Sequence, residues 1–491
     1  MSDRGTVSER HRVAIVGAGI GGLGLAHGLR EDGIDDFVLL ERSDGVGGTW
    51  RHNTYPGAAC DVPSHLYSYS FAPNPRWSKV FADQPEILDY LERCADEWEL
   101  RSHLRTGWKV AEAHWSQDDC CWTLRSATGE TVVAAVVVFA TGMFDEPRPV
   151  AIEGIDAFDG DTVHSARWDH SVELEGRRVG VVGTGASGVQ IVPEVAKVAA
   201  RTLVFQRTPP YVLPRRDPPY TAEEQARFES DAAELARVRD ELYWAFEGTE
   251  AFRLGNPMAE VVKGIAIEHL ERRIPDPALR AKLTPDYELG CNRTLISSDF
   301  YKAVVRDDVD LVTEPIARVR PEGVETVDGV VHDLDVLVLA TGFRAGEYLH
   351  GIDVVGMHGE QLHERWAEHP HAYLGMTITG FPNMFVFYGP NTNQGGNSII
   401  LILEAQAIYV RGALDAMARD GLAALDVRRD SLDRYERELL EAMSGTVWAT
   451  GCHSYFTDAG GRVVTQLPHT SRWYAERTAT FDLHEYEVTP R

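Results

Sequence analysis

The glycine-rich stretch near the start of the chain constrains the fold more than any other feature. The apolar residues 13–16, VAIV, run into a turn that holds Gly17, Gly19 and Gly22. A helical pattern and a second apolar run, FVLL, follow, and Glu41 comes directly after them. This order of strand, glycine turn, helix, strand and carboxylate predicts a βαβ unit that binds a dinucleotide.

Each residue of this motif has a physical role in nucleotide binding. Gly17 allows a tight turn, Gly19 lets the backbone approach a pyrophosphate, and Gly22 lets helix and strand pack closely. The helix N-terminus offers unpaired N–H groups and a positive dipole end to the phosphates. Glu41 lies about 20 residues beyond the last glycine, where a carboxylate accepts hydrogen bonds from a ribose. A glycine turn alone would also suit an ordinary α/β domain, but the strand, helix and acid together favour a nucleotide site.

A second copy of this pattern, RRVGVVGTGASGVQIV, holds Gly183, Gly185 and Gly188. Two separate glycine turns predict two bound nucleotides. The strand that follows runs to Arg207 rather than to an acid. A guanidinium at this place pairs with a 2′-phosphate, which a carboxylate would repel. The second nucleotide is therefore predicted to be NADPH, with a surface arginine at a strand end as the alternative.

These two motifs predict an α/β fold with two Rossmann-like dinucleotide-binding domains, the second inserted into the first. The first domain is expected to comprise residues 1–150 and 336–491, and the second residues 151–335. A helical insertion is expected in the second domain at about residues 221–285, and it begins with one long charged helix. The stripe of Leu235, Leu242 and Phe246 on that helix is expected to be a packing surface, with a lid over the substrate as the alternative.

Charge and hydropathy exclude several classes of partner. The chain of 491 residues has a net charge of −27, which argues against nucleic acid or an anionic membrane surface. No apolar run approaches the roughly 20 residues that span a bilayer. The first 12 residues contain no apolar core of a signal peptide, so a cytoplasmic protein is expected.

The cysteines form neither a disulfide framework nor a metal-ligand spacing, so reduced and mostly buried thiols and no metal site are expected. Many proteins with two nucleotide folds are disulfide reductases, which need a C-x-x-C or C-x-x-x-x-C pair. Neither spacing occurs, which argues against that class. The six cysteines are Cys60, Cys94, Cys120, Cys121, Cys291 and Cys452.

The segment after Glu41, GGTWRHNTYPGAACD at residues 47–61, suits neither a regular helix nor a strand. It resembles the first fingerprint of the Baeyer–Villiger monooxygenases, a group of class B flavoprotein monooxygenases, with the pattern G-G-x-W-x-x-x-x-(F/Y)-P-G-x-x-x-D. The resemblance implies that the first nucleotide is FAD and that this loop lies beside its isoalloxazine ring. The matching residues are Gly47, Gly48, Trp50, Tyr55, Pro56, Gly57 and Asp61.

A second stretch, FDGDTVHSARWD at residues 158–169, matches the other fingerprint of that family, F-x-G-x-x-x-H-x-x-x-W-(P/D). The segment joins the two expected domains and is far in sequence from the flavin loop. We therefore expect His164 to serve a hinge or domain-coupling role rather than chemistry. The matching residues are Phe158, Gly160, His164, Trp168 and Asp169.

Later segments resemble the family with some departures. The family has a Lys-Arg pair after Gly-Cys, and here the pair is Asn292 and Arg293, which implies a weaker preference for NADPH than Arg207 alone suggests. The closing segment around Asn391 contacts the flavin in the family. Tyr455 and Leu467 stand where the family usually has tryptophan, at positions beside the substrate pocket, so the substrate cannot be carried over.

The glycine motifs and the resemblance together define the expected cofactor site. The strand-closing ATG segments at residues 140–142 and 340–342 add turns where the backbone can approach a cofactor. The predicted cofactor-binding residues are Gly17, Gly19, Gly22, Glu41, Gly48, Thr49, Trp50, Asp61, Thr141, Gly142, Gly183, Gly185, Ser187, Gly188, Gln190, Arg207, Thr208, Thr341, Gly342 and Asn391.

The implied activity is that of an FAD-dependent Baeyer–Villiger monooxygenase. NADPH reduces FAD, and reduced FAD adds dioxygen to give a flavin peroxide that attacks a small ketone or a related carbonyl compound and yields an ester or lactone. Arg293 is expected to favour the anionic peroxide, and Asp61 to hold the guanidinium in place. The alternatives are a surface ion pair for Arg293 and a loop cap for Asp61. S- or N-oxygenation of sulfides or amines and a non-catalytic nucleotide-binding regulator are the alternative functions, and the oligomeric state stays open.

Overall fold

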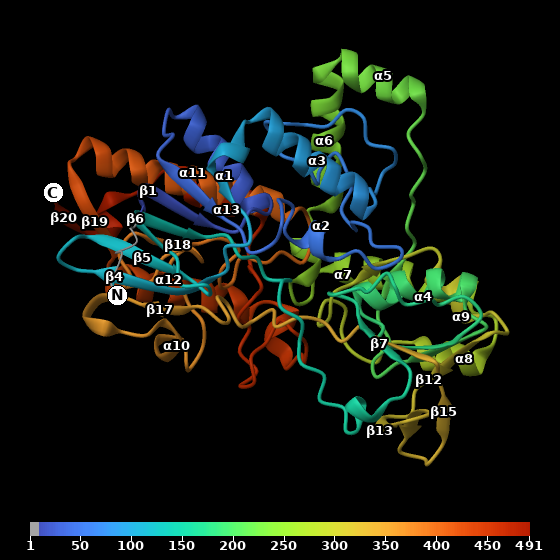
Figure 1. Cartoon of the computed structure of the whole chain (residues 1–491). Coiled ribbons are helices and arrows are strands. Elements are labelled where there is room, and N and C mark those ends of the chain that lie inside the picture. Colours follow the sequence, from blue (N-terminus) through green and yellow to red (C-terminus); the bar gives the residue numbers. More distant parts are fainter. Residues whose placement is uncertain (1–8) are drawn as a thin grey trace.

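The computed structural model describes residues 9–491, which form two units, one built on a mixed sheet and the other on a parallel sheet (Figure 1). The larger sheet has the order β17-β4-β5-β6-β1-β2-β3, and β18 pairs with β6 beside this path. Its strands are β1 (Glu9–Val16), β2 (Phe37–Leu40), β3 (Leu104–Arg105), β4 (Val110–Ser116), β5 (Cys121–Ser126), β6 (Thr131–Phe139), β17 (Asp353–Val355) and β18 (Met384–Val386).

Strand β1 is central because both of its faces are buried. Val13 and Ile15 belong to the core shared with α1 (Ile20–Glu31) and α11 (Ile399–Arg419), which lie together over the sheet (Figure 1). Ala14 and Val16 belong to the core on the opposite face. Since successive side chains of a strand point to opposite faces, burial of both faces requires the continuous apolar run seen in the sequence.

The other elements of the larger unit are helical, apart from one two-stranded antiparallel sheet. They are α2 (Thr49–His52), α3 (Gln84–Glu97), α10 (Leu362–Arg365), α12 (Arg429–Ser444), α13 (Ser471–Thr478), the 3₁₀ helices η1 (Leu100–His103), η4 (Met357–Gly359), η5 (Val447–Thr450) and η6 (Leu483–Glu485), and the strands β19 (Leu422–Val427) and β20 (Tyr486–Pro490).

The second unit is built on a five-stranded parallel sheet with the order β12-β9-β8-β16-β7. The predicted fold class, α/β with two Rossmann-like units, is confirmed. The elements are η2 (Ile155–Ala157), β7 (Asp161–His164), β8 (Arg178–Val182), α4 (Ala186–Val198), β9 (Arg201–Phe205), β10 (Val212–Leu213), β11 (Leu295–Ile296), α9 (Phe300–Val304), β12 (Val309–Val312), β13 (Ile316–Arg320), β14 (Gly323–Thr326), β15 (Val331–Asp333) and β16 (Val336–Leu339).

The chain enters the second sheet after β6 and returns to the first at β17. The expected return at residue 336 falls inside the second sheet, because β16 pairs in parallel with β7 and β8. The chain therefore leaves this sheet after Leu339, a few residues later than expected. The division into domains of residues 1–150, 151–335 and 336–491 otherwise stays a prediction about folding units.

The helical insertion differs from the single long helix expected at its start. The chain breaks at Asp231, whose carboxylate accepts hydrogen bonds from the N–H groups of Ala233 and Glu234 and so caps a new helix. Figure 1 shows α5 standing away from the sheets beyond the end of α6. The elements are α5 (Ala222–Ser230), α6 (Ala232–Phe246), η3 (Thr249–Phe252), α7 (Pro257–Arg273) and α8 (Pro277–Leu283).

Helix α6 is anchored to the first unit. Leu242 and Phe246 pack against the core of that unit, and Leu235 is buried. Arg239 donates a hydrogen bond of 2.6 Å to the carbonyl oxygen of His65. The predicted stripe is thus a packing surface, and the insertion bridges the two units.

The expectation of six reduced cysteines is wrong for two of them. Cys291 and Cys452 form a disulfide across a sequence separation of 161 residues, with their Cα atoms 5.1 Å apart. Such a pair leaves no signature in local cysteine spacing, because only the fold brings the two residues together. The other four cysteines carry thiols, and three of these are buried.

No helix within residues 9–491 combines the length and the apolar character needed to cross a membrane.

Candidate active site

The glycines of the first turn divide into two kinds. A Cβ on Gly17, which has a φ of +106°, would lie 2.5 Å from the carbonyl oxygen of Ala140. A Cβ on Gly22 would lie 1.9 Å from the carbonyl oxygen of Gly17. A Cβ on Gly19 would meet nothing closer than the Cα of Gly48 at 3.5 Å. The protein itself therefore requires glycine at two positions, and the third leaves an open approach to the backbone.

The second turn repeats this division. A Cβ on Gly183 would lie 2.6 Å from the carbonyl oxygen of Ala340, and one on Gly188 would lie 2.1 Å from that of Gly183. Among the described residues, no atom lies within 4 Å of a Cβ on Gly185. Ala140 and Ala340 open the two ATG segments, so each glycine turn packs against the end of a neighbouring parallel strand.

Both turns deliver a helix N-terminus to the same cavity. The N-caps of α1 and α4 are Gly19 and Gly185, and neither first turn has a side-chain cap in the described part of the chain. The unpaired N–H groups and the positive end of each helix dipole therefore face the cavity. We call the turn with the N-terminus of α1 the first cradle and the turn with the N-terminus of α4 the second cradle. Each cradle is open and fits one pyrophosphate.

A cavity of about 1740 Å³ extends past both turns, and most of the predicted site residues line it. Gly22 and Gly188 pack helix against strand instead. The side chain of Asn391 donates to the carbonyl oxygens of Val463 and Gln466 and lies outside the described cavity wall. The predicted residues on the wall are Gly17, Gly19, Glu41, Gly48, Thr49, Trp50, Asp61, Thr141, Gly142, Gly183, Gly185, Ser187, Gln190, Arg207, Thr208, Arg293, Thr341 and Gly342.

Glu41, which follows β2, and Arg207, which follows β9, differ in charge and in contacts. Glu41 is buried and accepts hydrogen bonds of 2.8 Å from the N–H groups of Ala18 and Ser43, which fixes its carboxylate beside the first turn. Arg207 is exposed and has no acidic partner among residues 9–491, so its guanidinium is available to an anion. Asn292 also lies on the cavity wall. It occupies the position at which the family pattern has a lysine, so the chain lacks that second cation.

Arg293 and Asp61 meet inside the cavity across the two units. The Nε of Arg293 donates to Asp61 at 3.0 Å, and its Nη2 donates to both carboxylate oxygens at 2.6 and 2.7 Å. This paired geometry fixes the plane of the guanidinium. The carboxylate raises the pKa of Arg293 above its usual value, so the side chain keeps its charge.

Two tyrosines that were not assigned as site residues flank Arg293. The hydroxyl of Tyr455 lies close to Arg293, and burial raises the pKa of this hydroxyl although the guanidinium opposes the shift. Tyr388 is also close to the pair and donates a 2.6 Å hydrogen bond to Asn393. The ring of Phe144 lies edge-on to both tyrosines, at centroid distances of 5.9 and 6.4 Å. The family pattern had pointed to Tyr455 only as a departure from tryptophan.

Comparison with known proteins places this arrangement in a family. A model of the flavin-binding monooxygenase-like family matches residues 10–227. A Baeyer–Villiger monooxygenase of Streptomyces coelicolor is 42% identical over 99% of this chain and 94% of its own length. One of Pseudomonas aeruginosa is 38% identical over 98% of this chain and 92% of its own length. This chain belongs to the Baeyer–Villiger monooxygenases.

Solved structures agree with this assignment. A steroid monooxygenase bound to NADP has a TM-score of 0.88 and 31% identity, with 98% of this chain and 100% of that chain covered. A cyclohexanone monooxygenase from Rhodococcus sp. Phi1 bound to NADP⁺ has a TM-score of 0.88 and 27% identity, with 99% and 100% covered. The predicted family and enzyme class, a flavin-dependent monooxygenase of the Baeyer–Villiger type, are confirmed.

The first Baeyer–Villiger fingerprint loop also joins the two units. The hydroxyl of Tyr55 donates to the side-chain oxygen of Gln190 on α4, and the amide nitrogen of Gln190 donates to Ala59, both at 3.0 Å. A Cβ on Gly57, whose φ is +80°, would lie 2.8 Å from the carbonyl oxygen of Gln190. Sequence reasoning assigned Gln190 only to the cofactor, whereas its amide also couples the flavin loop to the second nucleotide helix.

The second Baeyer–Villiger fingerprint lies at the edge of the second sheet. His164 ends β7, and its Nε2 lies 3.2 Å from Oγ1 of Thr341, directly after β16. Its Nδ1 accepts a 3.1 Å hydrogen bond from the N–H of Ala166. Both ring nitrogens are thus engaged at the start of a crossover between the units. This placement agrees with the domain-coupling role expected from the sequence, which stays a prediction.

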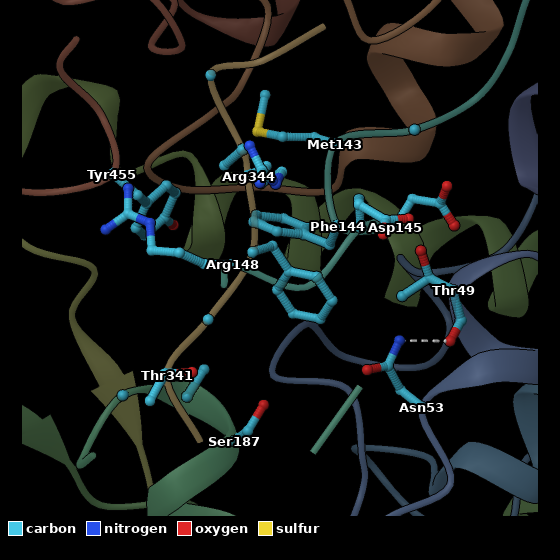
Figure 2. A pocket seen from close by; sticks show the side chains of 18 of the residues that line it. Thr49, Asn53, Met143, Phe144, Asp145, Arg148, Ser187, Thr341, Arg344 and Tyr455 are labelled. Atoms are coloured by element: carbon cyan, nitrogen blue, oxygen red, sulfur yellow. Dashed lines mark hydrogen bonds between the residues drawn. The ribbon is translucent and has the colours of Figure 1, made fainter. Parts of the chain in front are cut away.

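The two crossovers between the units run side by side along the cavity. Pro147 and Phe343 form an antiparallel bridge. The N–H of Arg148 donates to Gly342 at 2.9 Å, and the N–H of Arg344 donates to Glu146 at 3.0 Å. Figure 2 shows side chains of both crossovers projecting into the pocket, among them Phe144 and Arg344. Tyr455 therefore lies near the first crossover, through its ring contact with Phe144, and also near Arg293.

Proposed function

We propose that this chain uses NADPH and dioxygen, with FAD, to convert a small ketone into an ester or lactone. FAD occupies the first cradle and NADPH the second. Relatives support this pair of cofactors, since a structure described as the OTEMO complex with FAD and NADP has a TM-score of 0.86 and 28% identity over 98% of this chain. The observation that carries the proposal is the Arg293–Asp61 pair, which lies in the cavity that both cradles share.

The bound flavin, once NADPH has reduced it, supplies the activation of dioxygen. The residues of the chain do the rest. The two helix N-termini bind the pyrophosphates and orient both cofactors toward the same space. Arg293 stabilises negative charge that develops on oxygen during attack at the carbonyl carbon. Asp61 holds the guanidinium in one plane, so this stabilisation requires no rearrangement during the reaction.

Arg207 is proposed to select NADPH over NADH. It follows the second strand of its unit, lines the cavity and has no acidic partner among the described residues. A 2′-phosphate would supply that partner. Because Asn292 stands where the family pattern has lysine, the preference is expected to be modest.

The experiment that tests the proposal follows one oxygen atom. The holoenzyme is incubated with NADPH under ¹⁸O-labelled dioxygen, with a cyclic ketone in one reaction and an alkyl aryl sulfide in another. One labelled oxygen in a lactone, formed with NADPH consumption, is the expected result. A labelled sulfoxide without any lactone would favour S-oxygenation instead. No NADPH consumption under air with any substrate would favour a non-catalytic regulator.

We also propose that the enzyme works in the cytoplasm, where NADPH is regenerated. The disulfide between Cys291 and Cys452 is unusual for that compartment. Fractionation of the producing cell, with detection of the protein in the cytoplasmic fraction, tests this location. Its recovery outside the cytoplasmic fraction would contradict the proposal.

A further inference from the structure

The disulfide joins the two chain segments that bear Arg293 and Tyr455. Cys291 lies two residues before Arg293, in the loop between α8 and β11, and Cys452 lies three residues before Tyr455, just after η5. Both cysteines are buried, with 8% and 4% of their surface exposed. The cross-link is therefore part of the inner packing around the cavity and not a surface bond.

Around the disulfide, the segment that bears Cys291 packs closely against the segment that bears Cys452. Cys291, Cys452, Phe252 and Trp448 belong to one apolar cluster. The indole nitrogen of Trp448 donates a 3.1 Å hydrogen bond to the carbonyl oxygen of Gly290. A Cβ on Gly290, whose φ is +94°, would lie 2.5 Å from the ring of Phe252. The loop before Arg293 thus fits closely against the helical insertion and the C-terminal segment.

Arg293 lies on this loop, and its guanidinium is held by contacts with neighbouring side chains. It lies outside every helix and strand, two residues before the two-residue strand β11. Asp61, in the first unit, accepts hydrogen bonds from its guanidinium, and Tyr455, in the C-terminal segment, lies close to it. Residues on loops need support from neighbouring groups to stay in a productive geometry. The disulfide provides a covalent support of fixed length.

We propose that Cys291 and Cys452 are positioning residues whose disulfide keeps Arg293 and Tyr455 in contact, so that reduction of the bond uncouples oxygenation from NADPH oxidation. This inference rests on the proposed function of Arg293. A small dithiol supplies two electrons and two protons, the S–S bond breaks to give two thiols, and the dithiol closes to its own disulfide. Exchange with an oxidised glutathione disulfide reverses the change and releases two equivalents of the glutathione thiol.

The chemistry predicts a defined count of thiols. The chain has six cysteines and two form the bond, so alkylation of the denatured, air-equilibrated holoenzyme should label four, by the arithmetic 6 − 2 = 4. Treatment with dithiothreitol before denaturation should raise the count to six. Six labelled cysteines without a reductant would overturn the proposal at once, because the bond would be absent from the active enzyme.

The functional test compares ester formed per NADPH consumed before and after reduction. Reduction is expected to lower this ratio roughly tenfold and to raise hydrogen peroxide release. The reason is that a displacement of a catalytic group by about 1 Å can cost about 100-fold in rate. Reoxidation should restore the ratio. Cys452→Ser should show the low ratio from the start and no response to dithiothreitol, with NADPH oxidation maintained.

Cys120→Ser is the matched control, because Cys120 is a partly exposed thiol in the turn between β4 and β5. It should respond to dithiothreitol as wild type does. An unchanged ratio in fully reduced wild type, with six thiols counted, would overturn the positioning role. Failure of the oxidised wild type to form any ester would instead count against the proposed function, so the two failures are distinguishable.

Discussion

At the residue scale, some glycines of the two turns are required by the packing of the protein itself, and others are required by the approach of the cofactor. Gly17 and Gly22 leave no room for a side chain, because a Cβ on either would meet a backbone carbonyl oxygen. Gly19 and Gly185 have room as far as the described protein is concerned, yet they cap the helices that face the cavity. Substitution at these two pairs of positions should therefore fail in different ways.

Gly19→Ala should fold but lose FAD, because its methyl group would stand between the backbone and the pyrophosphate. Gly185→Ala should keep FAD and weaken NADPH binding. Gly22→Ala should lose folded protein, since its Cβ would lie 1.9 Å from the carbonyl oxygen of Gly17. The ratio of flavin to protein absorbance and the melting temperature measure both effects. Full flavin content in soluble Gly19→Ala would contradict the assignment of FAD to the first cradle.

Arg207→Ala should raise the KM for NADPH about ten- to a hundredfold, because a charge-assisted contact contributes about 1.5–3 kcal/mol. The KM for NADH should hardly change, since NADH lacks the 2′-phosphate. Asn292→Lys should strengthen the wild-type preference by restoring a second cation on the cavity wall. Steady-state kinetics with both nucleotides measure these ratios. Equal losses for NADPH and NADH in Arg207→Ala would assign the residue to structure instead.

At the scale of elements, loops and helix ends build the contacts between the two units. The first fingerprint loop holds α4 through Tyr55, Gln190 and Ala59. The helical insertion is anchored to the first unit by α6, which exists as a separate helix because Asp231 caps it. These contacts fix the relative position of the two cradles, which hydride transfer between their cofactors demands.

Asp231→Ala should loosen the start of α6, because loss of an N-cap costs about 0.5–2 kcal/mol. Amide hydrogen exchange in residues 232–246 should become about tenfold faster for each 1.4 kcal/mol of lost local stability, while the two sheets keep their protection. Asp240→Ala, at an exposed position in the middle of the same helix, is the matched control. Equal exchange in the two variants would contradict the capping role.

At the scale of the whole molecule, the sequence predicted the features that are local and missed those that depend on distant pairs. The glycine turns and Glu41 lie within one βαβ unit, so their spacing alone predicts their place. Arg293 and Asp61 came from the family pattern, because 232 residues separate them. The contact of Tyr455 with Arg293 and the bond between Cys291 and Cys452 left no local signal.

The helix break at Asp231 shows a different limit of sequence reasoning. An aspartate within a charged helical pattern suits both a continued helix and a new N-cap. Packing of Leu242 and Phe246 on the first unit, which periodicity alone does not reveal, favours the break. The late end of the second sheet has a similar cause, since the pairing of β16 depends on β7, far earlier in the chain.

The central claim is that Arg293, oriented by Asp61, stabilises the negative charge that oxygenation generates. The measurement is ester formed per NADPH consumed, together with hydrogen peroxide release, for wild type, Arg293→Ala and Asp61→Ala at full flavin content. Removal of one preorganised donor to a developing oxyanion costs on the order of 100- to 1000-fold in rate. Arg293→Ala should therefore lose nearly all ester, and Asp61→Ala should lose less because it acts through Arg293. Wild-type ester yield and coupling in Arg293→Ala would contradict the account.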